Sequence, residues 1–170
     1  DAERHDRFRG TPGAFGTAVR ALEAFADAGV FTYTNLCLSR SILENGGLHR
    51  YLDLARELRV GVVQLLEPKP CGRYALCRPQ DLFTEEDRGR VMTFFQEVNR
   101  PGPYGGHPPV AYTAHFERPE NFGCLMGGLA HMAIDSRGEV TPCVFLPVTF
   151  GNILHEDVAG IVERMRSARL

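Results

Sequence analysis

The sequence predicts an α/β fold followed by a smaller α+β part. In the first part, amphipathic helices alternate with strands rich in β-branched and aromatic residues, and the connections are short. This order favours parallel strands joined by right-handed crossovers. After Pro68 the alternation stops, and a loop with several Pro and Gly residues leads into one helix, short strands and a tight turn. We therefore expect the architecture to change near that proline.

The first part is expected to contain two helices and two strands in alternation. Apolar residues at helical spacing predict a helix over residues 13–28, which Gly29 ends as a left-handed cap. Residues 30–36 are typical of a strand, and a second helix is predicted over residues 48–58. The nearly continuous apolar run 60–66 predicts a strand that is buried on both faces.

Two parallel strands cannot bury both faces of a sheet, so two interpretations are open. Either the neighbouring strands precede Asp1, or later segments of the chain complete a small open sheet. The chain begins at Asp1 without methionine, which suits a piece of something longer, and residues 1–10 are charged and expected to be irregular. Unpaired strand edges would make the isolated chain poorly soluble.

The segment after the second strand predicts loops on both sides of one helix. Residues 67–78 form a Pro/Gly-containing loop in this interpretation. The helix has an N-terminal signature at residues 84–87 and is expected to reach about Asn99. Residues 100–109 contain four prolines and three glycines, so we expect a linker or loop there. Residues 110–116 predict a strand.

Two cysteines, Cys124 and Cys143, bracket a predicted β-hairpin. The sequence between them alternates as a strand does and turns at residues 135–138. A hairpin brings its two ends side by side, so both thiols could face one metal centre. The step Gly151-Asn152 follows, and then an amphipathic helix over residues 156–169. This combination predicts an iron–sulfur or similar metal site.

Composition narrows the class of protein. Of 170 residues, 44% are hydrophobic and 24% are charged, which is ordinary for a globular protein. The net charge of −2 does not suggest a nucleic-acid partner, and no apolar run approaches the ~18 residues of a membrane-spanning helix, so neither nucleic acid nor a membrane is expected. Five cysteines fit a secreted disulfide framework poorly, which favours a cytoplasmic protein with metal-ligating thiols.

Three segments resemble one known family. The opening, residues 5–15, is similar to the motif HD-x-x-RG-x-x-G-x-F, which follows the fourth barrel strand in that family. The strand ends at residues 34–35 and 67–70 look like those of the fifth and sixth barrel strands. The stretch from Cys124 to Cys143 fits the pattern C-x(9–15)-G-x(4)-C. The chain thus resembles the C-terminal half of radical S-adenosylmethionine enzymes that carry a SPASM or twitch auxiliary-cluster extension.

The resemblance implies an architecture. It is the C-terminal part of a partial (β/α)6 TIM-like barrel, followed by a small α+β SPASM/twitch-like extension with a β-hairpin. The barrel portion would span residues 1–68, a connecting loop and helix residues 69–109, and the auxiliary iron–sulfur module residues 110–170. The main partner would be the missing N-terminal half of the barrel.

The resemblance also implies an activity for a parent protein. Such an oxidoreductase or modifying enzyme forms a 5′-deoxyadenosyl radical from S-adenosylmethionine and abstracts hydrogen from a peptide or a small metabolite. The chemistry needs a C-x3-C-x2-C loop, and this chain has no such triplet. We therefore expect the chain alone to be inactive.

The candidate metal ligands are cysteines. A [4Fe–4S] auxiliary cluster normally takes four thiolates, for which Cys124 and Cys143 are the first pair and Cys71 and Cys77 the second. No cysteine follows Cys143, so the chain suits one auxiliary cluster, as in the twitch arrangement. Zinc accepts the same sulfurs, so a non-catalytic zinc-stabilised scaffold or binding module is the alternative. Cys37 ends a predicted strand and is expected to be a small buried hydrophobe.

Three further residues are candidates for binding the cofactor S-adenosylmethionine or the substrate. The cation of Arg9 could meet the cofactor's carboxylate. Asn35 and Glu67 stand at the predicted C-terminal ends of the two strands, where barrels place their chemistry. His5 and Asp6 belong either to this site or to the cap of the following helix.

Overall fold

The structure is a computed structural model, and its residues form two compact units. Each unit is made from two separate stretches of the chain: unit 1 comprises Asp1–Pro68 and Phe83–Thr113, and unit 2 comprises Lys69–Leu82 and Ala114–Leu170. The three-part division expected from the sequence stays a prediction. The residues that the structure describes are 1–76, 83–102, 106–124 and 130–168.

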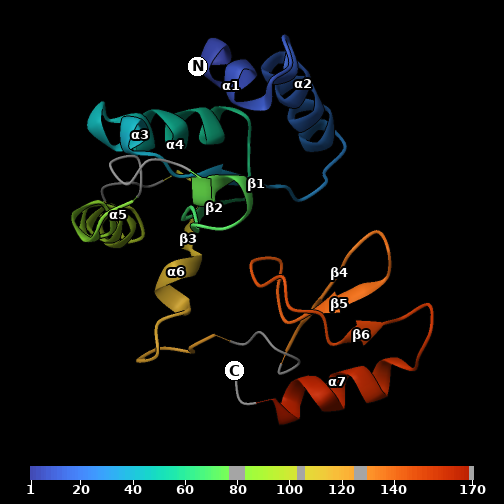
Figure 1. The fold of residues 1–170 in the computed structure, drawn as a ribbon. Helices are drawn as coiled ribbons and strands as arrows, with labels where there is room; N and C mark the ends of the chain where they lie inside the picture. The colour runs from blue at the N-terminus through green and yellow to red at the C-terminus, as the bar shows by residue number, and fades with distance from the viewer. Residues whose placement is uncertain (77–82, 103–105, 125–129, 169–170) are drawn as a thin grey trace. The chain divides into compact units, whose positions relative to one another are not determined.

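Unit 1 is built on a parallel sheet of the order β1-β2-β3 (Figure 1). The strands are β1 (Tyr33–Cys37), β2 (Val62–Leu66) and β3 (Val110–Tyr112). The two strands predicted first are confirmed, although each begins two or three residues later than expected. The predicted strand 110–116 is only partly right, because it ends at Tyr112 and continues as the short helix α6 (Thr113–Phe116). A later segment therefore supplies the third strand of the sheet.

Five helices lie in the described residues of unit 1. They are α1 (Ala2–Arg9), α2 (Ala14–Asp27), α3 (Arg40–Glu44), α4 (Gly47–Glu57) and α5 (Glu85–Val98). The predicted helices 13–28, 48–58 and 84–99 are confirmed as α2, α4 and α5, whereas α3 was not expected. At the start of α5, Thr84 and Asp87 form a reciprocal capping box, which explains the N-terminal signature.

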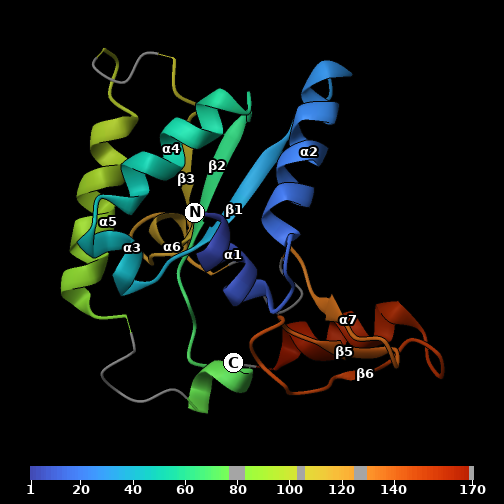
Figure 2. The ribbon, with the colours of Figure 1, turned by 90° about the horizontal axis from the view of Figure 1, so that it is seen from above.

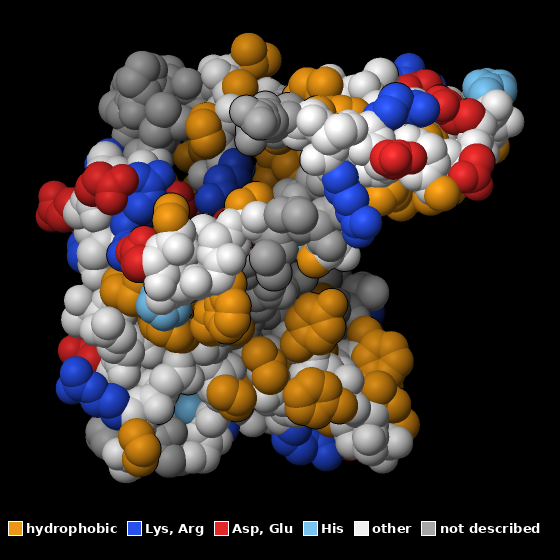
Figure 3. Space-filling view, turned by 90° about the horizontal axis from the view of Figure 1, so that it is seen from below, with side chains coloured by type: hydrophobic (Ala, Val, Ile, Leu, Met, Phe, Trp, Pro, Cys, Tyr) orange, Lys and Arg blue, Asp and Glu red, His pale blue; other side chains and the backbone are white. Residues whose placement is uncertain are grey.

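The two faces of the sheet in unit 1 differ. On one face Val63, Leu65 and Tyr112 are buried beneath helices, and Figure 2 shows α4 lying over β2 and β3. On the other face Asn35 is exposed and Tyr33 is 61% exposed. Seen from the side away from α3 and α4, hydrophobic side chains reach the surface in patches (Figure 3). Parallel sheets are usually covered on both faces, so this face of unit 1 lacks a cover among the described residues.

Most of residues 1–10 form the helix α1 rather than irregular structure, which corrects the sequence expectation. Asp1 caps α1 through the backbone N–H of Arg4, and Glu3 pairs with Arg7 one turn later. These local contacts stabilise a helix that buries none of its residues and therefore has no apolar periodicity to reveal it.

The turn between α1 and α2 is organised by Asp6. Its carboxylate accepts hydrogen bonds from the backbone N–H groups of Phe15, at 2.7 Å, and Gly13, at 2.6 Å. These bonds hold the pKa of Asp6 below its usual value. Asp6 therefore caps the helix that follows, as one of the two sequence interpretations had it.

Unit 2 contains a small antiparallel sheet and a helix that packs on it (Figure 1). The strands are β4 (Ala133–Ile134), β5 (Glu139–Thr141) and β6 (Gly151–Asn152), the helix is α7 (Val158–Ser167), and a 3₁₀ turn covers Gly72–Leu76. The core consists of Val140, Ile161 and Met165, and each fully buried side chain of this size contributes about 1.5–3 kcal/mol. The predicted hairpin turn is confirmed by the bond from the N–H of Gly138 to the carbonyl of Asp135, at 3.1 Å.

None of the helices in the described parts of the chain is both long and apolar enough to cross a membrane.

Candidate metal centre

Cys143 is held firmly at the end of β5. Its side chain is largely buried, at 7% exposed, and it follows the buried Pro142. Two donors meet its carbonyl oxygen: the hydroxyl of Thr141, at 3.0 Å, and the N–H of Leu146, at 3.3 Å. Hydrogen bonds from its own chain therefore hold the backbone of Cys143 at its carbonyl group.

The other candidate cysteines are placed more loosely. Cys124 is exposed and follows Gly123, which has a positive φ of 70°. Cys71 is half-buried, and its carbonyl accepts the N–H of Tyr74 at 3.1 Å at the start of the 3₁₀ turn. Cys77 lies outside the described residues.

The described cysteines of unit 2 are all free thiols, but they do not form a complete set of metal ligands. Cys71, Cys124 and Cys143 are all free thiols in one compact unit, although Cys71 comes from a separate stretch of chain. The Lys69 ammonium lies 3.6 Å from the Glu117 carboxylate and links the two stretches. Within the described ranges, no three His, Cys, Asp or Glu side chains gather as metal ligands would. Free thiols are the right donors for an iron–sulfur cluster, so the donor set fits by chemistry, and the ligand assignment stays a prediction.

Cys37 is exposed, which corrects the expectation that it is buried. It is the last residue of β1, and its neighbours of the same parity, Tyr33 and Asn35, are exposed with it. The expectation failed because it assumed a sheet covered on both faces.

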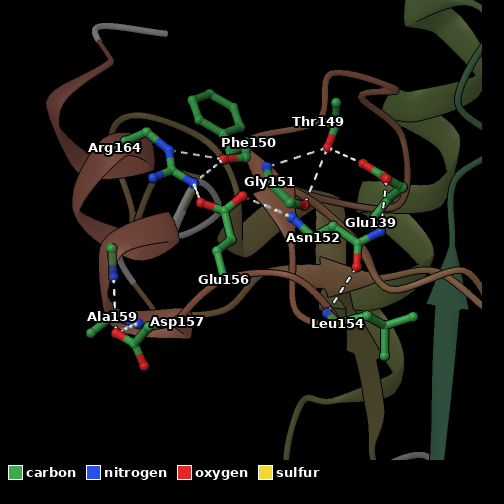
Figure 4. A network of polar contacts seen from close by, with 11 residues as sticks. Glu139, Thr149, Phe150, Gly151, Asn152, Leu154, Glu156, Asp157, Ala159 and Arg164 are labelled. Carbon is green, nitrogen blue, oxygen red and sulfur yellow. Dashed lines mark hydrogen bonds and ion pairs between the residues drawn. The ribbon is translucent and has the colours of Figure 1, made fainter.

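A polar network lies behind β5 and joins it to β6 and α7 (Figure 4). The Asn152 amide donates from Nδ2 to a carboxylate oxygen of Glu139, at 2.9 Å, and the other Glu139 oxygen accepts the hydroxyl of Thr149. From α7, Arg164 donates to the carbonyl of Phe150, at 2.9 Å, and pairs with Glu156. The network therefore connects the strand that precedes Cys143 to the closing helix.

The carboxylates of this network are stabilised in the charged form. Hydrogen bonds from Thr149 and then Asn152 lower the pKa of Glu139. The Arg164 guanidinium, followed by the backbone N–H of Asn152, lowers the pKa of Glu156 in the same way.

Two glycines make room for the network. A Cβ atom on Gly138, whose φ is 84°, would lie 2.6 Å from Oδ1 of Asn152. One on Gly151, whose φ is 147°, would lie 2.3 Å from Oε1 of Glu156. Both positions combine a positive φ with a close neighbour. This explains why glycine stands between Cys124 and Cys143 at position 138, and why glycine precedes Asn152.

In unit 1, Glu67 is a buried carboxylate that other side chains already engage. Its side chain is 5% exposed, and its two oxygens accept from Nε of Arg88, at 2.8 Å, and from the hydroxyl of Tyr112, at 3.1 Å. Glu67 thus ties the end of β2 to α5 and β3. Its predicted part in binding the cofactor remains a prediction.

Asn35 and Arg9 occupy different settings. Asn35 is the third of five residues in β1, so it does not stand at the strand's end as expected, and it is exposed on the uncovered face. Beside it in register lies Gln64, whose amide donates to the hydroxyl of Thr113 at 2.8 Å. Sequence reasoning missed Gln64, although a polar residue in the middle of an apolar strand was the available signal. Arg9 is exposed in the last turn of α1.

Comparison with known proteins decides the resemblance. The family described as SPASM, an iron–sulfur cluster-binding domain, matches residues 124–170. This chain is similar to radical S-adenosylmethionine enzymes with a SPASM extension. The matched residues, which we call the SPASM segment, begin at Cys124 and include Cys143 and the whole polar network. Cys71 of unit 2 lies outside the segment, as do Arg9 and the other candidate residues of unit 1.

Three curated relatives are all named AdoMet-dependent heme synthase. The one from Oleidesulfovibrio alaskensis is 28% identical over 89% of this chain and 43% of its own length. Those from Nitratidesulfovibrio vulgaris and Methanosarcina barkeri are 28% and 26% identical, over 90% and 96% of this chain and 46% and 50% of their lengths. The chain therefore spans about half the length of the curated relatives it matches.

A solved structure shares the fold. The crystal structure of Streptococcus suis SuiB bound to precursor peptide SuiA matches 90% of this chain and 37% of its own chain, with a TM-score of 0.62 and 13% identity. Together with the two sheets and their helices, this likeness confirms the α/β class.

Proposed function

We propose that this chain is the C-terminal portion of a radical S-adenosylmethionine enzyme, and that its SPASM segment holds one [4Fe–4S] auxiliary cluster. The ligands would be Cys124 and Cys143, with Cys71 and Cys77 completing the set. The observation that carries the proposal is the placement of Cys143. A free thiol sits at the end of an ordered strand, inside the segment that the iron–sulfur family matches.

The residues around Cys143 suit this role. A bound cluster supplies one-electron chemistry, whereas the protein supplies ligands, orientation and shielding from water. Cys143 is itself 7% exposed, and the preceding residues Val140 and Pro142 are buried, so the thiol has little access to water. The Thr141 hydroxyl and the N–H of Leu146 fix the carbonyl of Cys143, so the thiol is presented without rearrangement of β5.

We further propose that unit 1 is part of a partial (β/α)6 barrel whose other half belongs to the parent protein. The fold shared with SuiB supports this, as does the one-sided burial of the sheet. The uncovered face bears Asn35 and Gln64, and it would line the pocket for S-adenosylmethionine and substrate. Arg9 would meet the cofactor's carboxylate, and Glu67 would bind cofactor or substrate, as its place after β2 suggests.

For the parent's substrate, a small molecule of the tetrapyrrole class is the better-supported proposal. The three relatives, whose name says they act on heme synthesis, match nearly the whole of this chain at 26–28% identity. A peptide substrate is the second candidate, because SuiB was solved with a precursor peptide, although it shares 13% identity. Free thiols on an iron–sulfur ligand set suit a reducing cytoplasm. Without the C-x3-C-x2-C loop, the chain alone should not cleave S-adenosylmethionine.

The test is iron and sulfide analysis after anaerobic reconstitution. We expect about four irons per chain in the wild type, as one [4Fe–4S] cluster requires. Cys124→Ala and Cys143→Ala should each lose most of this iron, and the brown colour with it. Cys37→Ala is the matched control, since that thiol belongs to unit 1, and it should load normally. A colourless wild type that binds one zinc ion would contradict the proposal and favour the zinc-stabilised scaffold.

A further inference from the structure

We propose that Asn152 is a positioning residue for the cluster: it fixes the strand that carries Cys143 and thereby sets the orientation of this thiolate toward the iron. The inference rests on the proposed function, because it assumes that Cys143 is a ligand. Asn152 itself touches neither the thiol nor a bound group in this assignment.

Every hydrogen-bonding atom of the Asn152 side chain is engaged, and Figure 4 shows the bonds to Glu139 and Leu154. Nδ2 donates to the backbone carbonyl of Arg137 and to the carboxylate of Glu139, each at 2.9 Å. Oδ1 accepts the backbone N–H of Leu154 at 2.8 Å. One side chain therefore binds the hairpin turn before β5, the first residue of β5 and the chain after β6.

Two further contacts restrict the position of Asn152. Its backbone N–H donates to Glu156 at 3.2 Å, and its Oδ1 lies against the backbone of Gly138, where a Cβ atom would come within 2.6 Å. In the strand register Asn152 stands opposite Glu139, and Gly151 opposite Val140. The side chain therefore clamps the start of β5 from across the sheet.

The clamp is transmitted to Cys143 along a short, ordered path. Val140 is fully buried against α7, and its carbonyl accepts the N–H of Phe150 at 2.8 Å. Thr141 and Pro142 follow, and the Thr141 hydroxyl binds the carbonyl of Cys143. Three residues separate Glu139 from Cys143, and each of them is buried or hydrogen-bonded, so a shift at Glu139 should be passed on to the thiol. Partners beyond the metal ligands commonly orient those ligands in this way.

The test compares variants of the full-length protein that contains this chain. Asn152→Ala removes all three side-chain bonds, and Asn152→Asp keeps the acceptor for Leu154 but loses both donors and adds a charge beside Glu139. We expect both variants to lose cluster iron to a chelator roughly tenfold faster than the wild type. We also expect the electron paramagnetic resonance spectrum of the reduced auxiliary cluster to shift in g values. Cys143→Ala defines that spectrum, because the signal missing from this variant belongs to the site.

Asp157→Ala is the matched control for stability. Asp157 caps α7 in the same unit by accepting the N–H of Ala159, at 3.0 Å, and that of Gly160, at 3.4 Å. Both hydrogen bonds lie within the start of α7 and do not involve β5. Its loss should lower the melting temperature while the resonance spectrum and the rate of iron loss stay at wild-type values. A spectrum of Asn152→Ala and Asn152→Asp that equals the wild type would overturn the inference.

A second pair of variants covers the case in which Asn152 variants do not fold. Glu139→Gln keeps an acceptor for Asn152 and should retain the wild-type spectrum, whereas Glu139→Ala should shift it. Equal spectra for these two would also overturn the inference. If the wild type and Cys143→Ala give the same spectrum, the failure lies instead with the proposed function.

Discussion

Gly151 shows at the scale of one residue how the backbone limits the polar network of unit 2. Its φ of 147° is unfavourable for residues with a side chain, and the site of a Cβ atom lies 2.3 Å from Glu156 and 2.6 Å from Arg164. Both charged groups are held in place, since they bind each other and the backbone of Phe150 and Asn152. A methyl group at this position would therefore have to break the network.

We expect Gly151→Ala to lower the free energy of unfolding by about 1–3 kcal/mol, the usual range for backbone strain of this kind. Gly160→Ala is the matched control, because Gly160 lies in α7, has ordinary helical geometry, and would have no atom nearer to its Cβ than 3.8 Å. That variant should be neutral or more stable by up to about 1 kcal/mol. Chemical denaturation of both variants gives the comparison, and equal stabilities would disprove the strain argument.

At the same scale, the sequence predicted those residues whose role depends on the spacing of their near neighbours along the chain. The interval from Cys124 to Cys143 and the glycine within it predicted the hairpin and its turn. It could not find the partners of Glu67, because Arg88 and Tyr112 are 21 and 45 residues away and meet it only through the packing of α5 and β3. The position of Asn35 within β1 was missed for a related reason, since strand ends depend on pairing with β2.

At the scale of elements, α1 and α2 illustrate a helix pair organised by a single side chain. Asp6 of α1 binds two backbone N–H groups at the start of α2, and its carboxylate is therefore stabilised in the charged form. The sequence predicted α2 from its apolar stripe but not α1, whose stabilising contacts are local pairs between charged residues. Amphipathic periodicity signals helices that pack, and α1 buries no residue.

The Asp6 cap gives a prediction about pH. Because its pKa is lower in the folded protein than the ordinary 3.8, its contribution is present above about pH 3.8 and is lost as the pH falls through the folded value. Asp6→Ala should therefore melt at a lower temperature than the wild type at neutral pH, and the difference should shrink in acid. Asp6→Asn keeps one acceptor oxygen, so its loss at neutral pH should be smaller, and this loss should also shrink in acid as the wild-type carboxylate is protonated. Melting followed by circular dichroism measures all three; a difference that persists in acid contradicts the assignment.

At the scale of the whole molecule, the uncovered face of unit 1 is the main departure from a self-contained fold. The sheet buries Val63 and Leu65 on one side and exposes Tyr33 and Asn35 on the other. The run of apolar residues in β2 predicted burial on both faces of the sheet. The described residues cover only one face, and the sequence of the strand itself does not contain this information. Burial is a property of what surrounds a strand, and the surroundings lie outside the strand's own sequence.

We expect the isolated chain to self-associate through this face. Tyr33→Lys should reduce the association, since it places a charge on the exposed side of the edge strand β1. Leu76→Lys is the control: it removes an apolar side chain that is 85% exposed but does not belong to the sheet. Size-exclusion chromatography with light scattering reports the outcome. A monodisperse wild type, or equal improvement by both variants, would count against the expectation.

The discontinuity of both units restricts how this protein can be taken apart or recombined. An engineer who transplants unit 2, which contains the SPASM segment, as a cassette starting at Ala114 leaves Lys69–Leu82, and with it Cys71, in the donor. A faithful exchange between relatives requires three junctions, after Pro68, Leu82 and Thr113. Homologous recombination with one crossover between these stretches would produce hybrids whose unit 2 comes from two parents. Such hybrids should be selected for compatibility at the level of the unit and not of the contiguous gene segment.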